Sequence, residues 1–215
     1  HSIGDQISEA LTLHRPELSE ADVLSVCLGL LEKVGIPSPA MFFKRYPHEF
    51  SGGMRQRAMI AMALVCNPKI LIADEPTAAL DVTIEAQILE LLESIKSEFN
   101  MSMIYISHDL AVIGEISDRI LVMYLGQIVE SGLADDVIDN PLHPYTRALL
   151  KSIPKIDQPI ESLEPIEGSI PSPFEVHTGC PFYSRCTERL GEICLRQKPD
   201  NKTYNYGHTV SCHLH

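Results

Sequence analysis

The chain is short of positive charge and lacks any long apolar run. Its 215 residues carry 17 lysines and arginines against 29 aspartates and glutamates, a net charge of −12. An acidic chain without a basic stripe is not expected to bind the phosphate backbone of a nucleic acid as its main task. The longest unbroken apolar run, Ala58 to Cys66, is far shorter than the roughly 18 residues that can span a bilayer. We therefore expect any membrane role to go through a partner.

The rest of the composition is that of an ordinary globular protein. Apolar residues make up 45% of the chain and charged residues 21%, which is typical of a domain with a real core. Apolar spacing predicts helices over residues 54–66 and 81–97. Between and after them, the short apolar runs 69–73 and 101–107 are typical of buried parallel strands. This alternation predicts an α/β fold.

The two ends of the chain differ from this middle part. Before this middle part, helices are expected over residues 5–13 and 20–34. After it, we expect a hairpin through Leu125-Gly126 (119–130) and a further helix over residues 145–152. After Pro154 prolines become frequent, helical periodicity fades, and four of the six cysteines appear. We predict a module boundary near residue 155.

A glycine pair stands immediately before the helix predicted at residue 54. The free N–H groups at a helix start attract anions, and the glycines of Ser51-Gly52-Gly53 would let a phosphate approach the backbone. The more ordinary interpretation is a plain N-cap, since serine is a favoured capping residue. For Arg57, shortly after this pair, the sequence allows either a solvated side chain or a contact with another residue.

Charged side chains follow both predicted strands. Asp74 and Glu75 end the first, and His108 follows the second. Open parallel sheets bind ligands at the carboxyl ends of their strands, where one carboxylate can hold Mg²⁺ and a second can act on a water. Solvated carboxylates and a structural histidine are the ordinary alternatives. The order of these features is more informative than any one of them.

In that order the motifs resemble the ATP-binding subunits of ABC transporters. SGGMRQR (51–57) is similar to the family's signature loop, with Phe50 where leucine is usual, and ILIADEP (70–76) is similar to its Walker B segment. Ala79-Leu80-Asp81 resembles the D-loop, and His108 the switch histidine. Four motifs in this order within about sixty residues form a specific combination.

Further resemblances indicate a branch of this family and show how much of the family sequence the chain contains. NPLHPYTRALL (140–150) and the cysteine-containing tail resemble the dipeptide and oligopeptide importers. The phosphate loop G-x-x-x-x-G-K-[ST] does not occur in the sequence, nor does the glutamine loop that follows it, and residues 1–11 resemble the family sequence just downstream. We therefore expect an N-terminally truncated copy that does not hydrolyse ATP by itself.

The resemblance implies a partial P-loop NTPase fold of the ABC nucleotide-binding type. Its parts would be a helical subdomain with the signature (1–66), the second half of the RecA-like catalytic core (67–155) and a small C-terminal extension with four cysteines (156–215). The family's site residues carry over to the matching positions here: Ser51, Gly52, Gly53, Gln56 and Asp81 for nucleotide binding, Asp74 for Mg²⁺, and Glu75 and His108 for catalysis.

The same resemblance implies the partners and the location. ATP would lie between two ATPase subunits, identical or paralogous, that drive two transmembrane permease subunits and serve an extracytoplasmic peptide-binding protein indirectly. The subunit would be peripheral, on the cytoplasmic face of the inner membrane, with residues 5–50 as the docking face. Alternatives are a non-catalytic docking subunit, an importer ATPase for another solute such as nickel, and an ATPase acting on nucleic acid, which the acidic charge disfavours.

The tail holds four cysteines in the spacing C-x5-C-x7-C-x17-C: Cys180, Cys186, Cys194 and Cys212. An even count permits disulfides, but an ATPase faces a cytosol that keeps thiols reduced, which favours metal. Zinc sites usually show closer cysteine pairs, and four thiolates also suit an iron–sulfur cluster. Similar importer ATPases carry such a tail, and a [4Fe–4S] cluster is implied for some of them. Zinc and unligated thiols stay open. His208 and His213 are further candidate ligands, whereas Cys27 and Cys66 are expected in the core.

Overall fold

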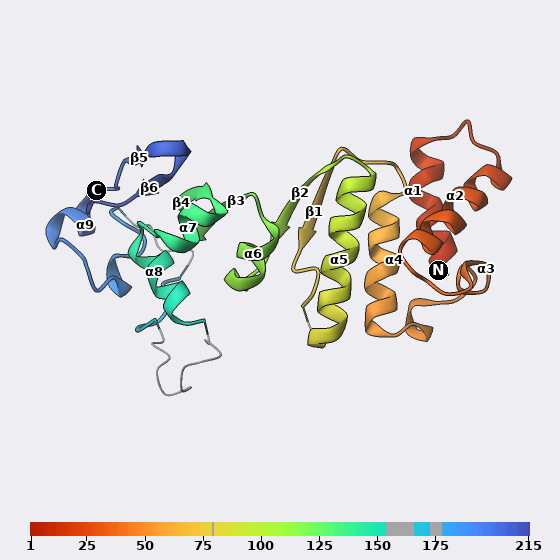
Figure 1. Ribbon diagram of the computed structural model, residues 1–215, viewed down its shortest axis with the longest axis horizontal. Helices are drawn as coiled ribbons and strands as arrows, with labels where there is room; N and C mark the ends of the chain where they lie inside the picture. The colour runs from red at the N-terminus through yellow and green to blue at the C-terminus, as the bar shows by residue number, and fades with distance from the viewer. Residues whose placement is uncertain (79, 154–165, 173–177) are drawn as a thin grey trace. The chain divides into compact units, whose positions relative to one another are not determined.

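The computed structural model describes residues 1–78, 80–153, 166–172 and 178–215, which form two compact units (Figure 1). The N-terminal unit comprises residues 1–107 and the C-terminal unit residues 108–215. The predicted boundary at 155 and Ala79 of the D-loop segment lie outside the described residues. The division into 1–66, 67–155 and 156–215 stays a prediction about function.

The N-terminal unit consists of helices around two short strands. In chain order these are α1 (Ile3–His14), α2 (Glu20–Lys33), α3 (Pro39–Phe42), η1 (Pro47–Glu49), α4 (Gly52–Leu64), β1 (Ile70–Asp74), α5 (Val82–Glu98) and β2 (Ser102–Ile106). The four long helices begin at residues whose side chains accept a hydrogen bond from the backbone N–H three positions on: Ser2, Ser19, Ser51 and Asp81. The helices predicted from apolar spacing are thereby confirmed, with ends shifted by one or two residues.

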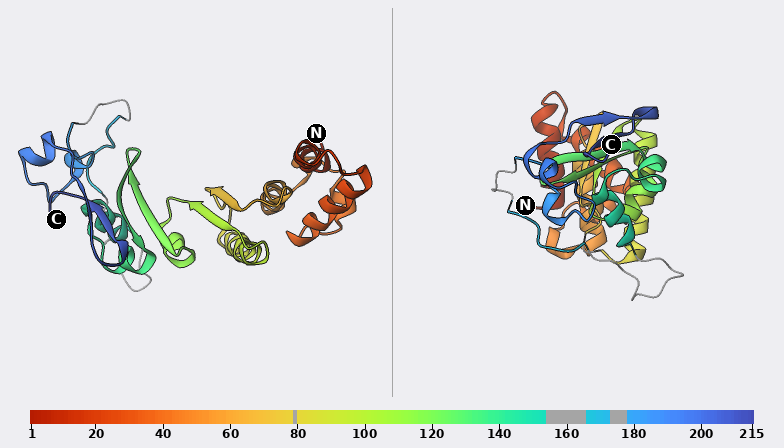
Figure 2. Two further views of the ribbon diagram at one scale, coloured as in Figure 1. Left: turned by 90° about the horizontal axis from the view of Figure 1, so that it is seen from above. Right: turned by 90° about the vertical axis from the view of Figure 1, so that its left-hand side faces the viewer.

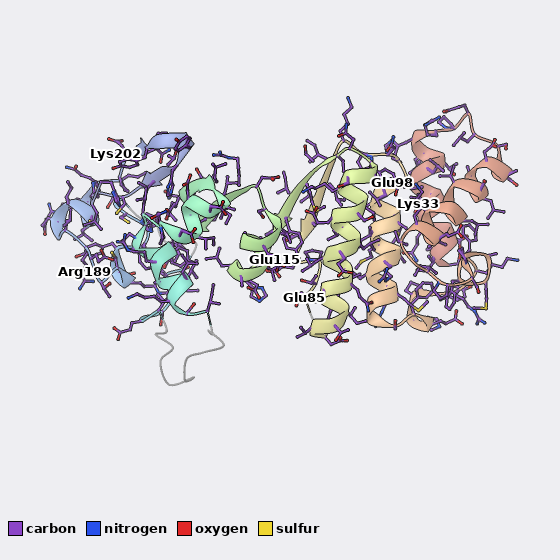
Figure 3. All side chains as sticks on the ribbon, viewed as in Figure 1. Lys33, Glu85, Glu98, Glu115, Arg189 and Lys202 are labelled. Carbon is purple, nitrogen blue, oxygen red and sulfur yellow. The ribbon has the colours of Figure 1, made fainter. Side chains whose placement is uncertain are left out.

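Apolar stripes on these helices form one core. Ile7 of α1, Leu31 of α2 and Ile88 of α5 are fully buried in it. At its edge Lys33 and Glu98 form an ion pair between α2 and α5, and the Lys33 ammonium lies 5.2 Å from the ring centroid of Phe99 (Figure 3). Among the described residues, no helix combines the length and apolarity needed to cross a membrane.

The two strands pair in parallel, as predicted, but β1 is buried on one face alone and β2 only half-buried on one. The register runs from Ile70 opposite Ser102 to Asp74 opposite Ile106. On β1 exposed and buried residues alternate, and Ile70 and Ile72 are 58% and 63% exposed. The expectation of a fully buried strand was wrong for the described residues, because helix α5 runs along one side of the pair (Figure 2) and the other side has no comparable cover.

The C-terminal unit is built on an antiparallel sheet. Its elements are α6 (Leu110–Ile116), β3 (Arg119–Tyr124), β4 (Gln127–Leu133), α7 (Ala134–Asp139), α8 (Pro144–Lys151), η3 (Tyr183–Arg185), α9 (Glu192–Arg196), β5 (Asn201–Thr203), η4 (Asn205–Gly207) and β6 (Thr209–Ser211). The strand order is β3-β4-β6-β5, so the end of the chain adds a hairpin to the edge of β4. The predicted turn at Leu125-Gly126 is confirmed, with φ of 46° and 74°, as in a two-residue type I′ loop.

Aromatic packing joins the cysteine-containing segment to this sheet. The ring of Phe182, 2% exposed, lies 5.2 Å from both the ring of Tyr124 of β3 and the ring of Tyr145 of α8.

One of the two cysteines expected in the core differs from expectation. Cys27 is buried as predicted, but Cys66 is exposed because α4 ends at Leu64, before the apolar run does.

Candidate functional site

The glycine pair lies at the exposed start of α4. Ser51 is the N-cap, and its hydroxyl accepts a hydrogen bond from the N–H of Met54 at 3.3 Å. The N–H groups of Gly52 and Gly53 have no acceptor within the helix, as at every helix start. A Cβ on Gly53 would lie 2.9 Å from Cγ2 of Ile84, so this glycine also permits close packing of α4 on α5. The plain N-cap is therefore present, with Gly52 exposed and Gly53 half-buried beside it, and anion binding there stays a prediction.

Arg57 is a contact residue that sequence reasoning left open. Its guanidinium donates to the carbonyl of Val34 at 2.7 Å and to Oε1 of Gln87 at 3.4 Å. The first bond satisfies a carbonyl at the C-terminal end of α2, and the second reaches α5. Arg57 thus fixes α4 between two neighbours, while Gln56 beside it is half-buried.

The two carboxylates leave the end of β1 in different ways. Asp74 is the last strand residue and is exposed, whereas Glu75 is half-buried and has φ of +47°. The Glu75 N–H donates to the carbonyl of Ile106 at 2.9 Å, which ties the turn to the end of β2. A non-glycine residue in the left-handed region costs about 1–3 kcal/mol, and such residues cluster at functional sites. Glu75 is thus held in an unfavourable backbone conformation at the strand end.

Asp81 is the N-cap of α5 and is exposed. Its Oδ1 accepts from the N–H of Ile84 at 3.0 Å. An added Cβ on Gly52 would lie 3.6 Å from Leu80, and Gly53 faces Ile84, so the start of α4 and the start of α5 are adjacent. The structure therefore brings together the glycine pair and the Asp81 segment, as two of the four predicted motifs.

His108 is exposed and follows β2 by two residues. It is the first residue of the C-terminal unit, whereas Asp74 and Glu75 belong to the N-terminal unit. The pairing of Ile106 with Asp74 sets where the two strands end. The convergence of His108 with the carboxylates stays a prediction.

The four tail cysteines line one pocket of the C-terminal unit. Cys180, Cys186, Cys194 and Cys212 are all free thiols, and His143 and His213 line the pocket with them. Burial raises the pKa of Cys180 to about 11, and burial also raises the pKa of Cys186 and Cys212. Such thiols stay protonated at neutral pH unless a metal displaces the proton.

The arrangement of this pocket bears on which metal it could hold. Within the described part of the chain, no three His, Cys, Asp or Glu side chains converge as ligands of a single metal ion. Neither the zinc interpretation nor the iron–sulfur interpretation gains support from this result. His208 is not at the pocket; instead its Nε2 lies 2.8 Å from Oε1 of Glu130.

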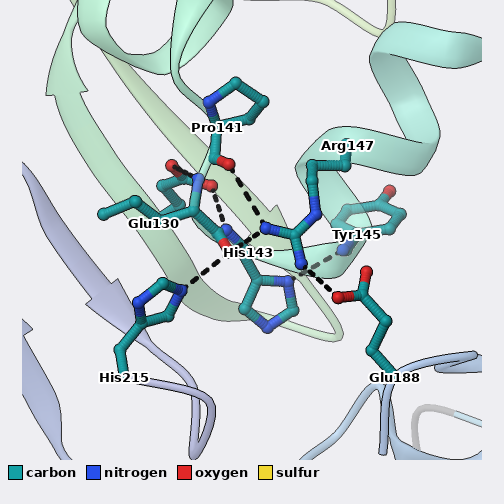
Figure 4. A network of polar contacts seen from close by, with 8 residues as sticks. Glu130, Pro141, His143, Tyr145, Arg147, Glu188 and His215 are labelled. Carbon is teal, nitrogen blue, oxygen red and sulfur yellow. Dashed lines mark hydrogen bonds and ion pairs between the residues drawn. The ribbon is translucent and has the colours of Figure 1, made fainter.

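A buried polar network that sequence reasoning missed lies next to this pocket (Figure 4). Glu130 of β4 has a fully buried carboxylate, whose Oε1 accepts from the N–H of Leu142 at 2.7 Å and pairs with His208. Its Oε2 accepts from the N–H of His143 at 2.8 Å. Arg147 donates to the carbonyl of Leu142 at 2.9 Å. Alternation along β4 gave no signal for this position, because Ile128, two residues earlier, is 46% exposed.

Comparisons with known proteins match both parts of the chain. The family model described as "ABC transporter" matches residues 7–78, and that described as "Oligopeptide/dipeptide transporter, C-terminal region" matches residues 129–194. "Oligopeptide transport ATP-binding protein AppD" of Bacillus subtilis is 48% identical over 214 residues, covering 100% of this chain and 65% of that protein. "Dipeptide transport ATP-binding protein DppD" of Bacillus subtilis is 48% identical over 213 residues, with coverage of 99% and 63%. The chain spans somewhat less than two thirds of the length of these relatives.

Solved structures are similar at the level of the fold. An inward-facing metal-chelate type ABC transporter matches with a TM-score of 0.59 and 22% identity, over 70% of this chain and 57% of that one. The cbiO1 protein of Clostridium perfringens, part of an ABC transporter complex, matches with a TM-score of 0.56 and 28% identity, over 65% of this chain and 53% of that one.

Proposed function

The chain belongs to the ABC transporter family, and on that premise we propose that it is part of the ATP-hydrolysing subunit of an importer of dipeptides or oligopeptides. Its α/β fold is that of an ABC-type nucleotide-binding domain. Relatives that are 48% identical carry oligopeptide and dipeptide transport in their names, which supports the choice of cargo.

The observation that carries the proposal is the exposed start of α4 beside the start of α5. Two N–H groups at Gly52 and Gly53 and the positive end of the helix dipole suit an anionic ligand. We assign to Ser51, Gly52 and Gly53 the binding of the γ-phosphate of an ATP whose phosphate loop belongs to a second subunit, and to Gln56 a further contact with the nucleotide. Asp81, adjacent to them, would lie at the seam between the two subunits.

The hydrolytic step is assigned to the residues at the strand ends. Mg²⁺, when bound with ATP, neutralises charge on the phosphates. Asp74 is exposed at the end of β1 and would help to hold this ion, usually through water. Glu75 would orient and deprotonate the attacking water, and its positive φ is the strain expected of such a position. His108 would sense the γ-phosphate.

Conversion of this chemistry into transport needs partners. We propose that a second ABC ATPase, identical or paralogous, closes on ATP and reopens after hydrolysis. Two transmembrane permease subunits would receive the motion through the docking face, residues 5–50 of the helical subdomain (1–66), and an extracytoplasmic peptide-binding protein would deliver cargo to them. The subunit would then be peripheral, on the cytoplasmic face of the inner membrane. Residues 67–155 would supply the catalytic core, and residues 156–215 the extension.

For the extension we propose a [4Fe–4S] cluster held by Cys180, Cys186, Cys194 and Cys212. Four cysteine thiolates are the usual ligand set of such a cluster. The chain offers four free thiols around one pocket, with a buried ring nitrogen of His143 that has no other partner in the described residues. The support for this assignment is therefore the donor set: four cysteine thiols that line one pocket. When bound, it would supply one-electron redox chemistry or a structural clamp.

The catalytic assignment is tested with Glu75→Gln in a polypeptide that joins this chain to a phosphate loop, completed to the length of its relatives. The amide keeps the size of the side chain but removes the base, so ATP should still bind while turnover falls by at least about 100-fold. Glu85→Gln, on the first turn of α5, is the matched control and should leave turnover unchanged. Unchanged hydrolysis in Glu75→Gln would remove Glu75 from its role.

A further inference from the structure

One ring nitrogen in the C-terminal unit is buried without a partner, and it belongs to His143. This residue is 1% exposed and is the N-cap of α8. Its Nδ1 accepts a hydrogen bond from the N–H of Tyr145 at 3.0 Å. Its Nε2 has no hydrogen-bond partner among the described residues, and His143 lines the pocket of the four cysteines. A buried polar atom without a partner is costly, so this nitrogen calls for a hydrogen-bond partner.

The hydrogen bond at Nδ1 decides which nitrogen carries the proton. Because Nδ1 is an acceptor, the neutral ring has its proton on Nε2. Burial lowers the pKa of His143 to about 4, so the ring is neutral at physiological pH. His143 therefore presents an N–H donor to the side of the ring that lines the pocket.

The ring is held in place by the network around Glu130. The Glu130 carboxylate accepts from the N–H groups of both Leu142 and His143 and is itself paired with His208. Two further contacts fix the carbonyl of Leu142: Arg147 donates to it at 2.9 Å, and Nε2 of His215 lies 3.1 Å from it. Four segments of the unit thus fix the backbone that carries the ring, which is how outer groups orient a group that acts at a metal centre.

The four cysteines bring sulfur atoms to the pocket as acceptors. Glu188, at the pocket wall, is paired with Arg147 at 2.7 Å, and Nε2 of His213 lies 2.9 Å from the carbonyl of Gln197. The sulfur of Cys194 already accepts a hydrogen bond from the N–H of Leu190 at 3.3 Å, so one sulfur here is used as an acceptor.

We propose that the Nε2–H of His143 donates a hydrogen bond to a sulfur atom of the iron–sulfur group held by the four cysteines, and so sets its reduction potential. This inference rests on the proposed cluster. Hydrogen bonds to cluster sulfurs stabilise the more negative, reduced state and raise the potential. His143 is thereby a tuning residue and not a ligand.

The test compares variants of the chain after anaerobic reconstitution with ferrous iron and sulfide. His143→Asn keeps the helix cap, because asparagine is a favoured N-cap whose short side chain can still accept from Tyr145, but it withdraws the donor from the pocket. His213→Gln is the matched control, since this histidine lines the same pocket with its Nε2 already engaged. Iron and sulfide content and the midpoint potential, followed by electron paramagnetic resonance, are the readouts.

We expect equal iron and sulfide content in all three proteins, a lowered midpoint potential in His143→Asn, and an unchanged potential in His213→Gln. A cluster of wild-type potential in His143→Asn would overturn the inference and leave the cluster proposal intact. A wild-type chain that takes up no iron or sulfide would overturn both. If His143→Asn loses the cluster, His143→Gln decides, because its amide can place an N–H near the former Nε2. A near-wild-type potential would then support the donor, and a clear fall would refute it.

Discussion

The two units place their polar groups in opposite ways. In the N-terminal unit the motif residues Ser51, Asp74 and Asp81 are exposed at the ends of elements, outside an apolar core. In the C-terminal unit Glu130 and His143 are buried, and the Glu130 carboxylate accepts from the N–H groups of Leu142 and His143 and pairs with His208. Exposed groups at element ends suit a site completed by another molecule. Buried networks suit a site that the unit completes by itself.

The sharpest way to break this contrast is to remove the buried carboxylate. Glu130→Ala should lower the free energy of unfolding by about 3–5 kcal/mol, because His208 and two N–H groups lose their partner in the interior. Glu192→Ala is the control. Its pair with Arg196 is 72% exposed on both sides and should matter by less than about 1 kcal/mol. Urea denaturation measures both, and equal losses would show that the network does not stabilise the unit.

The burial of His143 should make the stability of the chain decrease at acidic pH. Its pKa is about 4 in the folded chain and 6.5 as the ordinary value, so the unfolded chain takes up the proton first as the pH falls. The free energy of unfolding should therefore be unaffected by this group above about pH 7 and decrease between pH 6.5 and 4, by on the order of 3 kcal/mol. His143→Asn should remove that part of the pH dependence. Identical slopes for the two proteins in this range would contradict the assignment.

The N-terminal unit should respond to packing at its motif. Gly53→Ala places a Cβ 2.9 Å from Cγ2 of Ile84 and should cost about 1–3 kcal/mol of stability. Gly29→Ala, in the middle of α2 with open space around it, should instead stabilise by about 0.5–1 kcal/mol. A double-mutant cycle with Ile84→Ala should recover most of the Gly53 penalty. Additive losses would mean that the close approach is not the cause.

A smaller effect separates capping from function at Asp81. Asp81→Ala removes the acceptor for the Ile84 N–H and should cost about 1 kcal/mol, whereas Asp81→Asn should retain most of the stability. If Asp81 also lies at the subunit seam, Asp81→Asn should still impair ATP-driven closure of the completed pair. Thermal unfolding measures the first effect and ATP-dependent sedimentation the second. Full closure in Asp81→Asn would reduce this residue to a cap.

Sequence reasoning succeeded where local chemistry decides. The cap at Ser51 and the turn at Leu125-Gly126 follow from residue type, and the helices follow from apolar spacing. It failed where distant segments meet. Nothing in the sequence near Glu130 predicts that His208, 78 residues later, is its partner. The apolar run of β1 likewise does not predict that one face of this strand is exposed. Likewise the NPLHPYT segment was recognised by resemblance, while the role of His143 needed the pocket.

The most direct measurement is hydrogen exchange of the amides of residues 51–57 in the completed subunit pair, with and without Mg-ATP. If the backbone of Ser51 to Gly53 donates to a phosphate held by the partner, its exchange should slow at least about tenfold with Mg-ATP, as for amides that gain a bound acceptor. The protection should disappear once ADP replaces ATP. Unchanged exchange at residues 51–57, while the partner's phosphate loop is protected by the same ATP, would contradict the account.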